Sequence, residues 1–258
     1  MGGIVFVVNL AERPDLLEPA LALGDIGAEF MQHDQIGALT RARRLAVRWP
    51  EYFLVVLDGD VPVARAVSVP LVFPDTERAE LPDQGWDGII IWAIEDALDE
   101  RPPTCVAALD VQVTSDRRGE GIAAEALTFL RQSVRERGLS RLVIPVRPTT
   151  KDQLPSLPME QFLDRRRPDG SSADPWVRAH ERLGGQFVKV APFSMTIVGS
   201  LAQWQSWTGS SLDEGANVVE GALVPVLAST ELDVGVYVEP NVWMEHAVGQ
   251  PEAPDGGS

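Results

Sequence analysis

The chain has 258 residues, of which 45% are hydrophobic, and carries a formal net charge of −16 at pH 7. This length and composition suffice for a folded protein with a sizeable core. The acidic balance excludes a nucleic acid or an acidic membrane surface as the main partner, because such binding depends on clustered Lys and Arg. No segment reaches the roughly 18 uninterrupted apolar residues that a membrane helix requires. We therefore expect a cytoplasmic protein with neither nucleic-acid nor membrane partners.

The apolar residues 1–10 are followed at once by charged residues and lack a preceding basic region, so they predict a first strand rather than a signal peptide. Helical spacing of leucines predicts two helices within 13–48. Two segments rich in β-branched residues, 52–57 and 61–73, enclose Asp58-Gly59 and predict a hairpin. A loop then precedes a helix over 86–98.

The next strand is predicted over 104–113, and its end alternates between two faces, with Leu109, Val111 and Val113 on one and Asp110 and Gln112 on the other. An amphipathic helix that ends at Gly138 and a short apolar strand over 142–146 complete a strand-helix-strand unit. The elements that we expect after it are an insertion or lid (147–173), a helix (174–183), two strands (187–190, 194–198), a helix (201–207), a hairpin (222–228, 234–238) and a disordered tail (248–258).

The sequence has only one cysteine, Cys105, which excludes an intramolecular disulfide and a cysteine-rich metal site. Cys105 stands in an apolar segment, and we interpret it as a buried residue rather than a nucleophile. Two histidines, His33 and His246, have no partner at metal-ligand spacing. We therefore expect no bound metal.

The segment Asp116-Arg-Arg-Gly-Glu-Gly121 is the most informative motif, because it leads from a strand through a glycine turn into a helix. The backbone N–H groups at a helix N-terminus lack partners, and the helix dipole also favours an anion there. Arg117 and Arg118 add positive charge. This corner is therefore suited to bind a pyrophosphate.

The order of elements and this corner together resemble the GNAT superfamily of acyl-CoA-dependent N-acyltransferases. The family's corner reads Gln/Arg-x-x-Gly-x-Gly/Ala, and Asp116 departs from it at the first position. Ala179-His-Glu-Arg-Leu-Gly-Gly185 is similar to the family's Leu-Tyr-Glu-Lys-Leu-Gly-Phe, with His180 in place of the tyrosine. The resemblance covers about residues 50–198.

The resemblance implies an α/β fold of the α+β kind: a mixed central sheet flanked by helices, here with loop insertions and an extra C-terminal hairpin. We expect a single domain over 1–247, in which 199–247 form a C-terminal extension, followed by the tail.

The resemblance also implies that the pantetheine arm of coenzyme A enters between two parallel strands and pairs with the backbone of Leu109 to Val113. The pyrophosphate is then expected on the N–H groups of residues 118–123. The residues expected to bind the acyl-CoA are Val111, Val113, Arg117, Arg118, Gly119, Glu120, Gly121, Ile122 and Ala123.

Three catalytic roles are expected, and the two that fall to side chains each have a plainer alternative. His180 replaces a family proton donor, or else it lies on a helix surface without a catalytic role. Asp110 or Gln112 accepts the amine proton, directly or through water, or else contacts a neighbouring strand. The backbone N–H of Val111 or Val113 stabilises the oxyanion.

We expect transfer of an acyl group, most simply acetyl, from coenzyme A to the amine of a small molecule in a ternary complex. The insertions suggest secondary metabolism. Two alternatives remain open: an acyl donor bound to a carrier protein, and a coenzyme A binding module without catalysis, which the altered positions Asp116 and His180 would fit.

Overall fold

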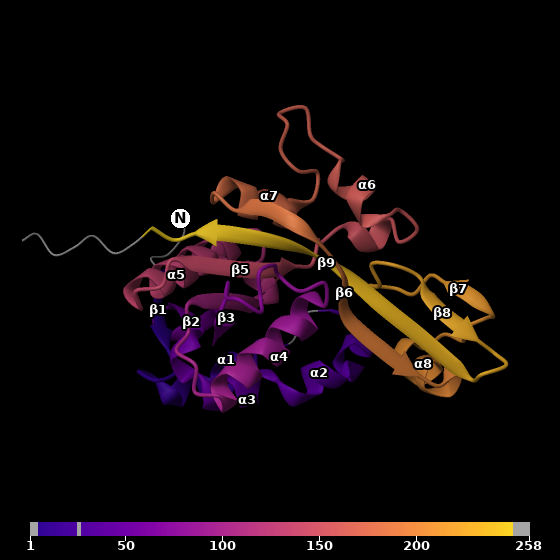
Figure 1. Cartoon of the computed structure of the whole chain (residues 1–258), viewed down its shortest axis with the longest axis horizontal. Helices are drawn as coiled ribbons and strands as arrows, with labels where there is room; N and C mark the ends of the chain where they lie inside the picture. The colour runs from indigo at the N-terminus through magenta and orange to yellow at the C-terminus, as the bar shows by residue number, and fades with distance from the viewer. Residues whose placement is uncertain (1–4, 25–26, 250–258) are drawn as a thin grey trace, which may run out of the picture.

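The computed structural model describes residues 5–24 and 27–249, and a mixed, mostly antiparallel sheet runs through them (Figure 1). Its strands lie in the order β1-β2-β3-β4-β5-β9-β8-β7, and β6 pairs with the free edge of β9. The strands are Val5–Asn9 (β1), Phe53–Asp58 (β2), Val61–Leu71 (β3), Cys105–Val113 (β4), Arg141–Val146 (β5), Gln186–Gly199 (β6), Gly215–Asn217 (β7), Val226–Ser229 (β8) and Val234–Ala247 (β9).

Helices cover both faces of the main sheet (Figure 1). Apolar residues of α5, α6 and α7 join one core cluster, and those of α1, α3 and α4 join a second cluster on the opposite face. None of the described helices is long and apolar enough to cross a membrane. The α-helices are Leu17–Leu21 (α1), Gln35–Leu39 (α2), Ala42–Arg48 (α3), Gly85–Leu98 (α4), Ile122–Glu136 (α5), Met159–Leu163 (α6), Pro175–Arg182 (α7) and Leu201–Thr208 (α8).

The expected strand-helix-strand unit is present as β4, α5 and β5. α5 buries Ile122, Ala126, Leu127, Leu130 and Val134, which recur at helical spacing, so one face of the helix packs on the sheet. Gly138 follows with a φ of +74°, a left-handed conformation that glycine adopts without steric cost.

The parallel pair β4 and β5 separates soon after it begins. The two strands are paired only at Val106 with Leu142 and at Ala107 with Val143. Beyond these pairs β4 remains bonded to β3 and β5 to β9, so each strand follows a different neighbour. The facing backbone edges of β4 and β5 are therefore not paired with each other beyond Ala107 and Val143, and we call this opening between the two strands the splay.

A register shift on β4 corrects the expected alternation of its side chains. Val67 of β3 lies opposite Asp110 and Ser68 opposite Ala108, which leaves Leu109 as an extra residue. Such a bulge reverses the side-chain pattern. Leu109 therefore packs with the cluster on the α4 face, whereas Val111 and Val113 pack with the α5 cluster.

The N-terminal region differs from the two helices expected within 13–48. It contains three short α-helices and 3-10 helices at Pro14–Leu16 and Glu29–His33. Gly24 and Gly27 have φ values of +82° and +108°, which a continuous right-handed helix cannot accommodate. The chain therefore changes direction here instead of extending one helix.

The C-terminal part is not only an added hairpin, because its last strand, β9, is also part of the main sheet. β8 and β9 form the expected hairpin, but β9 continues to Ala247 between β5 and β6. The two strands expected over 187–190 and 194–198 are one strand, β6, with an irregularity between Ala191 and Met195. Residues 195–239, which we call the C-terminal module, contribute most of a third core cluster. The expected tail lies, from residue 250, outside the described residues.

Candidate functional site

Residues 116–121, which we call the glycine corner, lie where β4 leads through a 3-10 helix at Ser115–Arg117 into α5. Gly119 and Gly121 have φ values of +85° and +90°, and Gly121 is the N-cap of α5 without any side-chain cap. A Cβ atom built on either glycine would meet no atom within 4 Å. The corner therefore offers free N–H groups next to open space, as an anion site requires.

The two arginines of the corner have different surroundings. Arg117 contacts Asp58 at 2.8 Å and Glu120 at 2.7 Å, so it ties the turn to the β2–β3 hairpin and much of its charge is neutralised. Arg118 and Asp116 are exposed. Of the two arginines, Arg118 is the one better placed to contact a phosphate.

Asp110 and Gln112 point away from α5, toward α1 and the segment that follows it. Asp110 forms an ion pair at 3.0 Å with Arg65, whose side chain is 2% exposed, while that of Asp110 is 25% exposed. The Nε2 atom of Gln112 donates to the carbonyl of Leu23 at 3.3 Å. Both residues thus contact neighbouring elements beside the splay, and Asp110 retains access to solvent.

His180 is fully buried, so it does not lie on a helix surface. Its Nδ1 atom is 3.0 Å from Nε2 of His246 on β9. Burial lowers the pKa of His180 to about 3 and that of His246 to about 4. Both imidazoles are therefore neutral near pH 7.

The histidine pair lies at the closed end of the splay. His246 is opposite Leu142, the residue at which β5 still pairs with β4. Within the part of the chain that is described, Nε2 of His180 and Nδ1 of His246 have no hydrogen-bond partner. His180 can be singled out from its motif, but its pairing with His246 cannot be predicted from the sequence, because 66 residues separate the two.

A pair of buried carboxyl groups, Asp34 and Asp87, was missed by the sequence analysis. Burial, reinforced by the charge of Asp34, raises the pKa of Asp87 to about 8, and burial also raises that of Asp34. Asp87 lies in the first turn of α4, next to Trp86, whose indole N–H donates to the carbonyl of Leu109 at 3.2 Å. The available signal was Asp87 itself, a carboxyl group at helical spacing from Ile90 and Ile94.

A buried polar network connects α4 with the middle of β9, at residues 237–241. Ser194 accepts a hydrogen bond from the backbone N–H of Trp86 at 2.8 Å and donates to Asn241 at 2.6 Å. Asn241 and Tyr237 both donate to Glu239, which is fully buried and also pairs with Arg147 at 3.1 Å. The network ties α4, β6 and β9 to Arg147, the residue that follows β5.

Two expectations about the remaining chemistry concern cysteine and metals. Cys105 is fully buried, as expected, and burial raises the pKa of its thiol to about 12. Among residues 5–24 and 27–249, no three His, Cys, Asp or Glu side chains are grouped so as to hold a metal ion.

The splayed parallel strands and the uncapped glycine corner together offer an unpaired strand edge that leads to an open helix N-terminus. The chain is 33% identical over 270 residues to the arginine N-acetyltransferase avaD of Aspergillus versicolor, with 92% of each protein covered. No family model matches the chain. The identity over nearly the full length shows that the chain belongs to the GNAT superfamily and is an acyl-CoA-dependent N-acyltransferase.

Two solved structures share the fold. The loading GNATL domain of CurA from Lyngbya majuscula has a TM-score of 0.58 at 13% identity, with 95% of this chain and 98% of that chain covered. The GphF GNAT-like decarboxylase in complex with isobutyryl-CoA has a TM-score of 0.56 at 15% identity, with 95% and 100% covered. These likenesses confirm the expected fold of a mixed sheet flanked by helices.

Proposed function

We propose that the protein transfers an acetyl group from acetyl-CoA directly to the amino group of a small molecule, with both substrates bound at once. The observation that carries the proposal is the splay between β4 and β5, which ends at the uncapped glycine corner of α5. The unpaired backbone edge of β4 suits the amide groups of a pantetheine arm. The free N–H groups of residues 118–123 suit its pyrophosphate.

The proposed reaction needs few side chains. The amine nitrogen attacks the thioester carbonyl, a C–N bond forms, the C–S bond breaks, and the thiolate leaves and takes up a proton. The N–H of Val111 or Val113 is proposed to bind the carbonyl oxygen as its negative charge develops. Those two N–H groups belong to the strand edge that β5 leaves unpaired.

The amine must lose a proton, and Asp110 remains our candidate acceptor, directly or through a water, with Gln112 as an orienting neighbour. Its partial exposure supports this role, and its ion pair with Arg65 at 3.0 Å fixes the position of the carboxylate. His180 remains a proposed proton donor, but its burial and its position at the closed end of the splay favour a packing role.

The donor and acceptor classes rest on the relatives as well as on the site. The avaD relative is named for arginine, which supports a small-molecule amine as acceptor. The CurA neighbour is a loading domain, which keeps a carrier-bound acyl donor as the second candidate. We also propose that the protein acts in the cytoplasm and belongs to secondary metabolism.

Purified protein incubated with acetyl-CoA and a panel of amines tests the proposal. We expect release of free thiol that depends on one class of amine, together with an acetylated product of matching mass. Tight acetyl-CoA binding without transfer to any amine would instead support the non-catalytic module. Transfer only from an acyl carrier protein would support the second donor.

A further inference from the structure

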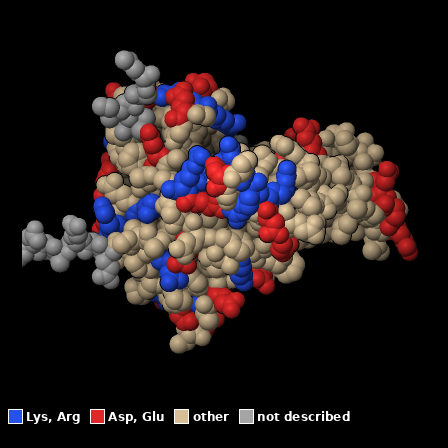
Figure 2. All heavy atoms as spheres, turned by 90° about the horizontal axis from the view of Figure 1, so that it is seen from above, with Lys and Arg blue, Asp and Glu red and all other residues tan. Residues whose placement is uncertain are grey.

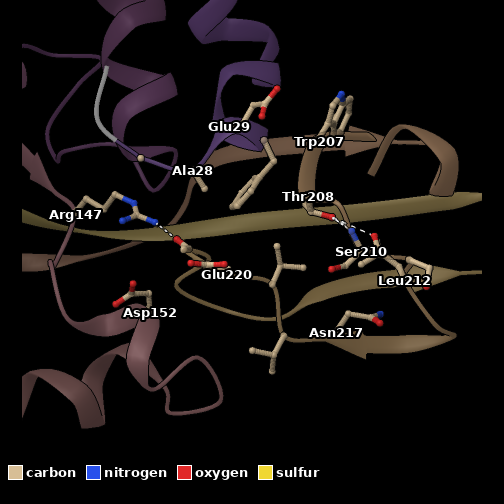
Figure 3. Close-up of a pocket in the computed structure, with 16 residues that line it drawn as sticks. Ala28, Glu29, Arg147, Asp152, Trp207, Thr208, Ser210, Leu212, Asn217 and Glu220 are labelled. Atoms are coloured by element: carbon tan, nitrogen blue, oxygen red, sulfur yellow. Dashed lines mark hydrogen bonds between the residues drawn. The ribbon is translucent and has the colours of Figure 1, made fainter. Parts of the chain in front are cut away.

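A pocket of about 560 Å³ opens beside the C-terminal module, outside the donor site described above (Figure 3). Its walls come from three parts of the chain: residues 27–30, the segment after β5, and the module. In Figure 3, Glu29 and Trp207 lie along the upper rim, Arg147 and Asp152 at the left, and Glu220 in the middle. This volume falls in the range of small-molecule sites.

The pocket adjoins the open end of the splay from two sides. Arg147, which lines the pocket, directly follows the last residue of β5, Val146. On the β4 side, Gln112 contacts the carbonyl of Leu23, and Gly27 of the pocket wall is four residues further along the chain. Four residues span at most about 14 Å. Short stretches of chain and one hydrogen bond therefore connect the pocket wall with both strands of the splay.

The charge of the pocket is negative. Three carboxylates, those of Glu29, Asp152 and Glu220, line it, and the Oδ1 atom of Asp152 is buried without a hydrogen-bond partner among the described residues. Among the lining residues that the structure describes, the one cation is Arg147, which is already paired with the fully buried Glu239. An orphaned buried carboxylate oxygen is costly, and a cationic ligand would satisfy it.

The module that forms the pocket wall is itself free of basic residues. No Lys or Arg occurs after Lys189 in the sequence, whereas Asp and Glu recur to the end of the chain. Figure 2 shows the same contrast from above: basic side chains gather over the main body, and acidic side chains mark the far end of the module. A cation entering the pocket therefore meets a negative field from the whole module.

We propose that this pocket holds the guanidinium group of the acceptor while the reacting amine of the same molecule lies in the splay. Asp152 is the central partner, because a guanidinium presents a planar fork of N–H donors that matches a carboxylate. Trp207, which also lines the pocket, is held in place by its stacking on His33, with 4.1 Å between ring centroids. This inference rests on the proposed function and specifies its substrate class.

Steady-state kinetics with four acceptors tests the proposal. Arginine and agmatine carry a guanidinium, lysine carries an ammonium, and citrulline carries a neutral group of the guanidinium's shape. We expect kcat/KM for arginine and agmatine to exceed that for citrulline by about a hundredfold, since a buried carboxylate would be left unpaired by the neutral group. Equal values for arginine and citrulline would overturn the proposal, and a preference for lysine would replace guanidinium by ammonium.

Asp152→Asn is the matching variant. We expect KM for arginine to rise about tenfold or more, as for the loss of a charged hydrogen bond, with KM for acetyl-CoA unchanged. Glu77→Gln removes a carboxylate that lies outside both the pocket lining and the module and serves as the control, with unchanged kinetics expected. If other amines are acetylated but Asp152→Asn has no effect on arginine, the pocket assignment fails and the proposed function stands. If no amine is acetylated, the proposed function itself fails.

Discussion

Two buried pairs of titratable residues carry perturbed pKa values, and their effects on stability have opposite signs. In the folded state the raised pKa of Asp87, beside Asp34, keeps a proton that an exposed aspartate would release. The lowered pKa values of His180 and His246 leave both imidazoles without the extra proton that exposed histidines would bind. Burial is the first cause in each case, because it disfavours the charged form. Each pair can therefore be tested by replacing a single side chain.

The first prediction concerns Asp87→Asn. With a folded pKa of about 8 against an ordinary value of 3.8, Asp87 contributes stability that is full below pH 4 and is lost as pH rises through 8. Asparagine keeps the shape, can donate to Asp34, and does not ionise. We expect the Tm of Asp87→Asn relative to the natural chain to increase steadily from pH 5 to pH 8. Parallel Tm curves for the two proteins would show that Asp87 is ionised in the folded state.

The second prediction concerns the role of His180. We expect His180→Asn, which keeps a polar atom near the Nδ1 position, to retain kcat within about threefold, because a general acid contributes about 10²-fold to 10⁴-fold. His180→Leu should lower Tm further, since it leaves Nε2 of His246 without its partner. A hundredfold fall in kcat of the asparagine variant, with Tm preserved, would instead establish His180 as the proton donor.

At the scale of elements, the glycine corner provides the third prediction. Gly121→Val places a side chain in the open space where a pyrophosphate is proposed, so we expect the Kd for acetyl-CoA to rise about tenfold or more. The matched control is Gly138→Val at the other end of α5, which has a similar positive φ and equally open surroundings. Both variants carry the same backbone strain, so calorimetric titration isolates the binding effect. Equal affinities in the two variants would remove the corner from the donor site.

Some elements could be predicted from the sequence because their signals are local. The β2–β3 hairpin contains Asp58-Gly59, and Asp174 caps α7 through the N–H groups of Trp176 and Val177, as its position before Pro175 indicates. The bulge at Leu109 could not be foreseen, because the register of β3 on β4 determines it. The alternation of side chains along β4 was therefore assigned to the wrong face at that one residue.

The proposed acceptor pocket could not be predicted from the sequence either, because it too depends on the tertiary fold. Residues of the pocket come from segments that are distant in sequence, such as Glu29, Asp152 and Glu220, and only the tertiary fold brings them together. The position of β9 between β5 and β6 could not be predicted either, because no motif in the residues of β9 indicates which strands it pairs with. The donor corner, in contrast, is a single continuous segment.

At the scale of the whole molecule, the buried pairs together predict how stability depends on pH. Between about pH 4 and 6.5 the two histidines take up protons on unfolding and Asp87 releases one. Stability rises with pH where this uptake exceeds the release from Asp87 and from Asp34, whose pKa burial also raises. Between about pH 6.5 and 8 only the release from Asp87 remains, and stability falls. We expect a maximum of the unfolding free energy near pH 6.5 in urea titrations.

The Asp87→Asn variant provides the control for that profile. Without the release of a proton from Asp87, the decline above pH 6.5 should disappear while the rise below it becomes steeper. A maximum that stays at the same pH in the variant would show that other groups determine the profile.

The path of β9 has a consequence for how such an enzyme acquires new acceptors. The chain leaves the main sheet along β6 and returns to it along the antiparallel β9, and the module at their far ends supplies much of the pocket wall but none of the glycine corner. The irregularity after Ala191 and the proline at position 240 mark the two places where the chain enters and leaves the module. If the pocket binds the acceptor as proposed, an exchange of residues 195–239 between relatives would alter acceptor choice in one genetic event and leave the proposed donor corner unchanged.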